Sequence, residues 1–156
     1  QAALWLNGRY CFAKTRENVL EEKALHQLAR QGLVEIAESD ELVSEYRVLT
    51  RCVLVPAKAK GICAFLSIKQ RELLLWLTEA GLRLTTAELV FLSERQISPA
   101  PNLLGEQNRQ TLTETIYTKE TIFDNILEAQ MEHAAVRDDV VFALLQLVKK
   151  KRLLLL

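Results

Sequence analysis

The sequence predicts a predominantly helical α+β fold with short β-hairpins. Apolar residues with helical spacing recur between residues that cap helices, and short apolar runs near Gly and Pro are typical of strands. Over 156 residues, the hydrophobic fraction of 49% and the charged fraction of 26% are those of a globular protein, which excludes a disordered or collagen-like chain. The length suits one compact domain or two small ones that share an interface.

The first expected elements are a hairpin and a helix. Residues 3–13 are rich in aliphatic and aromatic side chains around Asn7-Gly8, the dipeptide best suited to a tight hairpin turn. Thr15 can cap a helix whose apolar residues between positions 20 and 28 have helical spacing. Gly32 is placed to end it, so we expect this helix over about 16–31.

Two strands are expected next. Residues 33–36 alternate in the manner of a strand, and residues 38–41 form a polar stretch typical of a turn. Tyr46 to Val55 is an apolar, β-branched run closed by Pro56. The sequence from 16 to 56 therefore predicts a helix, a strand, a turn and a second strand.

A connector separates two predicted units. Residues 57–61, Ala-Lys-Ala-Lys-Gly, have the clearest low hydrophobicity in the chain. We therefore expect a helix plus β-wing unit over 1–57 and a helical, helix-turn-helix-like unit over 62–156.

Capping boxes open the second unit. Ser67-x-x-Gln70 predicts a helix over about 68–80 that stops at Gly81, and Thr85-x-x-Glu88 predicts another over about 86–95.

Three further helices are expected. Asn102 can cap a third helix that contains Leu112 and Ile116, and Thr118 or Thr121 can start a fourth. A fifth is expected over about 137–150, because its apolar residues form one broad face. Leu153–Leu156 after it indicates a buried terminal strand or the scar of a truncation.

One pattern extends over residues 18–50. An apolar-faced helix ends at Gly32 and runs directly into Leu33-Val34, and Tyr46-x-x-Leu49-Thr50 follows on the expected returning strand. This pattern resembles the winged-helix superfamily of DNA-binding domains, in which a recognition helix is followed by a two-stranded wing whose outgoing strand often reads Tyr-x-Leu-Thr. A looser version covers Leu144 to Leu154. The resemblance implies two winged-helix-like units and binding to double-stranded DNA.

Enzymatic chemistry is not indicated. His26 and His133 are the only histidines and have no Ser or Cys nucleophile in a recognisable local frame, and neither has metal-ligand spacing around it. His26 falls on the same helix side as Lys23 and Arg30, where we expect a solvent-exposed histidine. The five glycines are isolated, which excludes a phosphate-binding glycine-rich loop. We expect no enzyme activity, no cofactor and no metal.

Charge and cysteine content restrict the setting. Twenty basic and twenty acidic residues give a formal net charge of zero, so no long-range attraction to nucleic acid is built into the whole molecule. Cys11, Cys52 and Cys63 lack C-x-x-C spacing and sit among apolar neighbours, which favours reduced thiols and a cytoplasmic protein. No apolar stretch is long enough to cross a membrane, so we expect no membrane partner.

Candidate nucleic-acid-binding residues fall in three places. The third helix concentrates side chains that contact base edges in the major groove, namely Gln107, Asn108 and Arg109; the alternative is an ordinary polar helix face. Lys149, Lys150, Lys151 and Arg152 form either a phosphate-contacting patch or a cation cluster that interacts with the helix dipole. Lys23 and Arg30, with Lys14 and Arg16, are the third set.

Two functional hypotheses follow. The first is a non-enzymatic, cytoplasmic DNA-binding or regulatory domain of winged-helix type, which requires a continuous basic surface. The alternative is a protein-interaction or oligomerisation module within a longer chain, favoured by the zero net charge and by the apolar residues near both ends. Its partner is a second copy of the chain or another protein.

Overall fold

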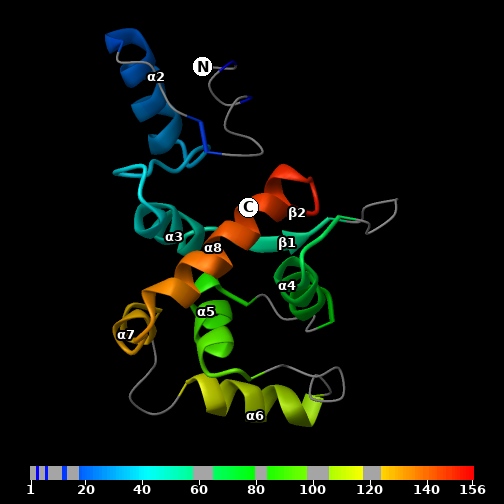
Figure 1. Cartoon of the computed structure of the whole chain (residues 1–156). Coiled ribbons are helices and arrows are strands. Elements are labelled where there is room, and N and C mark those ends of the chain that lie inside the picture. Colours follow the sequence, from blue (N-terminus) through cyan, green and yellow to red (C-terminus); the bar gives the residue numbers. More distant parts are fainter. Residues whose placement is uncertain are drawn as a thin grey trace.

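The computed structural model has a mostly helical α+β fold (Figure 1). The structure describes residues 18–57, 65–79, 84–97, 106–117 and 124–156, with positions 3, 6, 12 and 13. Its elements in chain order are α2 (Val19–Arg30), α3 (Leu42–Thr50), β1 (Leu54–Pro56), α4 (Ile68–Glu79), α5 (Thr86–Glu94), α6 (Glu106–Ile116), α7 (Asp124–Ala129), α8 (Ala134–Lys149) and β2 (Leu153–Leu155). The hairpin expected around Asn7-Gly8 lies outside the described residues.

Both predicted capping boxes are confirmed. Ser67 Oγ accepts a hydrogen bond from the Gln70 amide, and Gln70 Oε1 accepts one from the Ser67 amide, each at 3.1 Å. Thr85 and Glu88 make the same reciprocal pair. Each pair satisfies amides that the first turn of a helix leaves without a partner, so α4 and α5 begin where the sequence predicts.

The predicted limits of α2 are partly confirmed. Asn18 caps its start, because Asn18 Oδ1 accepts from the Leu20 amide at 3.0 Å, so the cap expected at Thr15 is wrong. Gly32 ends the helix as predicted, with a φ of 68° that suits glycine. Its amide donates to the carbonyl of Ala29, and the Leu33 amide donates to that of Leu28. These two bonds form a Schellman motif.

The predicted strand from Tyr46 to Val55 is wrong over its first half, because Leu42–Thr50 is the helix α3. The segment 33–36, expected as its partner strand, has no regular secondary structure. Apolar residues at 42, 46 and 49 have helical spacing, and Tyr46 and Leu49 are completely buried on the side of α3 that faces the core. The two-stranded wing expected from residues 33–36 and 46–55 is therefore not formed by them.

The strand expected at the end of the chain is confirmed, but it has a distant partner. β2 pairs antiparallel with β1, with Leu54 opposite Leu155 and Pro56 opposite Leu153. The amide and carbonyl of Val53 also exchange hydrogen bonds with those of Leu156. The pair places Leu54 and Leu153 in the core, where they are 3% and 0% exposed.

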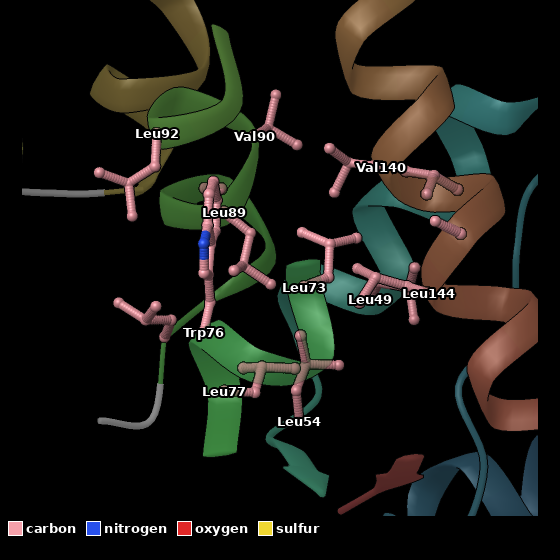
Figure 2. Packing of buried hydrophobic residues seen from close by; sticks show 14 of the residues in the cluster. Leu49, Leu54, Leu73, Trp76, Leu77, Leu89, Val90, Leu92, Val140 and Leu144 are labelled. Carbon is pink, nitrogen blue, oxygen red and sulfur yellow. The ribbon is translucent and has the colours of Figure 1, made fainter. Parts of the chain in front are cut away.

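The core is built around α8. Helices α3, α4 and α5 pack against it, and α6 and α7 pack against α5 (Figure 1). Figure 2 shows Val140 and Leu144 of α8 lying across from side chains of α3, α4 and α5. Each of the residues Leu49, Leu73, Leu89, Val90, Leu92, Val140 and Leu144 in that view is completely buried. The broad apolar face predicted for this last helix is thus confirmed.

Elements on both sides of the predicted domain boundary share this core. α3 and β1 precede the boundary, and their residues Tyr46, Leu49 and Leu54 belong to the same buried cluster as α4, α5 and α8. Of the connector expected over 57–61, residues 58–61 lie outside the described residues. α2 differs from the rest, since Leu28 is its only buried residue and Figure 1 shows it projecting from the helices around α8.

Candidate nucleic-acid interface

The exposed face of α2 gathers two of the predicted binding residues. Lys23 and Arg30 are both exposed, together with His26 and Gln27. Because these positions follow the spacing i, i+3, i+4 and i+7, they lie on one face of the helix, opposite the buried Leu28. Among the described residues, these four line an open hollow of about 580 Å³.

The charge on this face is positive. Lys23 and Arg30 lie two helical turns apart, about 10 Å along the axis. Glu22 borders this face, and its Oε1 lies 3.9 Å from His26 Nε2. The exposed position expected for His26 is confirmed, with 65% of its side chain accessible. His26 and Gln27 were not among the predicted binding residues, although their spacing from Lys23 and Arg30 places all four on one helix face.

The basic cluster after α8 has a structural role in part. Lys150 Nζ donates to the carbonyl of Phe65 at 2.7 Å and to Gln70 Oε1 at 2.9 Å. Gln70 is itself buried, so Lys150 joins the end of α8 to the start of α4. Lys151 takes a left-handed conformation with a φ of 56°. The carbonyl of Arg152 accepts from the amide of Ala57 beside the strand pair.

As DNA contacts, Lys149, Lys150, Lys151 and Arg152 therefore stay a prediction. Lys149 and Lys150 are exposed, as is Lys151, whereas Arg152 is half-buried. The alternative expectation, a cation cluster at the end of a helix dipole, agrees with Lys149 in the last turn of α8 and with the other three residues directly after it.

The third predicted group lies on α6. Gln107, Asn108 and Arg109 fall in the first half of this helix, but their side chains lie outside the described residues. The apolar residues predicted for this helix, Leu112 and Ile116, are buried as expected. Figure 1 shows α2 and α6 at opposite ends of the molecule, so the structure does not bring their predicted residues together.

A Glu–His pair that the sequence analysis missed joins α5 to the start of α8. Glu94 Oε1 accepts from the amides of Glu132 and His133 at 2.9 and 2.6 Å, and His133 Nδ1 lies 3.1 Å from the same oxygen. A carboxylate only accepts hydrogen bonds, so Nδ1 carries the proton in this assignment. Glu94 Oε2 is buried and has no hydrogen-bond partner among the residues that the structure describes. No local sequence pattern predicts this pair, because Glu94 and His133 are separated by 39 residues.

The described residues offer little for nucleophilic or metal chemistry. Burial, and then the negative charge of Glu35, raise the pKa of the Cys52 thiol above its ordinary value. The thiolate is the reactive form, so this thiol is a poor nucleophile. Within the described ranges, no three His, Cys, Asp or Glu residues are grouped to hold a metal ion. Cys11 and Cys63 lie outside those ranges.

Comparison of the chain with family models, with curated proteins and with solved structures gave no match. Among the described helices, none has the length and apolar character required to cross a membrane.

Proposed function

We propose that this chain is a non-enzymatic double-stranded DNA-binding module that contacts DNA through the exposed face of α2. The observation that carries the proposal is the gathering of Lys23, His26, Gln27 and Arg30 on one face of a helix that buries only Leu28. The winged-helix resemblance stays a prediction, and the proposal does not depend on a wing.

The shape of α2 supports this proposal. The major groove of DNA is about 12 Å wide and admits one α-helix. α2 has 12 residues and projects from the core (Figure 1). The residues of its outer face are exposed. Lys23 and Arg30 would contact phosphates or guanine edges, and Gln27 between them is of the type that pairs with adenine.

The experiment is fluorescence anisotropy of a labelled random-sequence duplex across a salt series. The slope of log affinity against log salt measures how many phosphates the protein neutralises. We expect Lys23→Gln combined with Arg30→Gln to weaken binding about ten-fold or more at low salt and to reduce the slope by about two.

The matched control is Arg47→Gln combined with Arg71→Gln, which removes the same charge from two exposed residues of α3 and α4. We expect the control to retain most of the affinity. Equal loss in both double variants would show a general charge effect, and no binding by the parent at the lowest salt would refute the proposal.

A further inference from the structure

The exposed side of α8 has opposite charges near its two ends. Asp139 and Lys149 are both exposed, and in the described part of the structure neither has an ion pair or a hydrogen-bonded side-chain partner. They lie about 15 Å apart along the helix axis, too far to pair with each other. Phe142 lies between them and is 57% exposed, so an aromatic side chain faces solvent between the two charges.

These residues lie on one stripe of the helix. Ala135, Asp139, Phe142, Gln146 and Lys149 follow steps of four and three residues, the spacing of a seam between two packed helices. The opposite side of α8 is buried in the core. Figure 1 shows α8 crossing the front of the molecule, in front of α3 and α5.

We propose that this stripe packs antiparallel against the same stripe of a second copy of this chain. A two-fold axis at the level of Leu144 places Asp139 opposite Lys149 of the second copy, and Lys149 opposite its Asp139. The same axis places Phe142 opposite Gln146 of the second copy. One symmetric contact thus satisfies both charges of each copy, as an isologous interface requires.

Charge complementarity favours a second copy of the chain, packed antiparallel, as the partner of this stripe. A parallel arrangement would place like charges against each other, and the carboxylate of Asp139 opposes binding of this stripe to a phosphate backbone. The formal net charge of zero adds no long-range repulsion between two copies. The proposal is independent of DNA binding by α2, whose exposed residues it does not use.

The expected dimer is weak. α8 has 16 residues and is about 24 Å long, so a single helix pair buries less than the roughly 1,600 Å² of a standard interface. We expect a Kd on the order of 10–100 µM, which falls as salt is lowered because the end pairs are exposed.

Sedimentation velocity of the full chain, from about 1 µM to about 1 mM and at low and high salt, tests the proposal. We expect Asp139→Lys and Lys149→Asp to raise the Kd about ten-fold or more each. The double variant exchanges the two charges, so it should restore the Kd to within about three-fold of the parent. Glu38→Lys, the same charge change at an exposed residue remote from α8 in sequence, should leave the Kd unchanged.

Phe142→Ser tests the same contact without altering charge. Because the side chain is more than half exposed, we expect little change in the thermal melting of the monomer and about a ten-fold higher Kd. A parent chain that stays monomeric over the whole range would overturn the proposal. A double variant as weak as either single variant would also overturn it, as would an equal effect of Glu38→Lys.

Discussion

Single residues decide how the helices end. Among the described residues, α2, α5 and α8 end in the same pair of backbone hydrogen bonds, which requires a left-handed residue just past the helix. Gly32 fills this position after α2, whereas Gln96 with a φ of 55° and Lys151 with a φ of 56° fill it after α5 and α8. In a residue with a Cβ, this conformation raises the free energy of the folded state by roughly 1 kcal/mol. Two helix ends thus hold strain that the first lacks.

Gln96→Gly should therefore stabilise the protein. Gln96 is exposed, and glycine relieves the strain of its positive φ, so we expect the free energy of unfolding to rise by about 0.5–1 kcal/mol. Urea denaturation of the parent and the variant measures this difference in the free energy of unfolding. Gly32→Ala is the reciprocal control and should lower the stability by a similar amount, since its Cβ meets no atom but its φ is 68°. A loss of stability in Gln96→Gly would contradict this account of the helix end.

At the scale of elements, α3 shows how tertiary packing overrides local preference. Tyr46, Val48 and Thr50 suit a strand, and Pro56 suits its end, which is why the sequence predicts one here. The helix forms because it turns Tyr46 and Leu49 together toward α8 and α5, where both are completely buried. In a strand, those two side chains would point to opposite faces.

Leu49→Ala tests whether Leu49 lies in the core. We expect a loss of about 2–4 kcal/mol in the free energy of unfolding, because a completely buried leucine is truncated and a cavity remains. Arg47→Ala, on the exposed side of α3, should change it by about 0.5 kcal/mol or less. Chemical denaturation of both variants gives the comparison. Similar small effects for the two would mean that Leu49 is not inside the core.

Across the whole molecule, the features that could be predicted from the sequence are the helix starts and ends, which depend on interactions between residues close together in the chain. The starts of α4 and α5 and the end of α2 depend on residues three to five positions apart, and each is confirmed. The partner of β1 and the partner of His133 depend on residues far along the chain, and no local pattern names them. In the candidate site, Lys23 and Arg30 were predicted from the sequence as binding residues. That they lie far from α6 could be seen only in the folded structure.

The strand pair should contribute stability mainly through its inner side chains. Leu153 is completely buried and Leu154 is 41% exposed, although they are adjacent leucines in the same strand. We expect Leu153→Ala to lower the free energy of unfolding by about 2–4 kcal/mol and Leu154→Ala by about 1 kcal/mol or less. Thermal and urea unfolding provide the two values. An equal loss for both would place the register of β2 in doubt.

The pairing of β1 with β2 also governs the order in which the core can be completed during synthesis. About 100 residues separate the two strands, so at 5–20 residues per second β1 emerges roughly 5–20 s before its partner exists. Through that interval Leu54 lacks the strand that covers it, and α8, around which the core is arranged, is also still to be made. Closing so large a loop makes the ribbon a late, non-local folding event. Nascent chains of this protein therefore present an unsatisfied apolar strand to chaperones until the final residues of β2 are added.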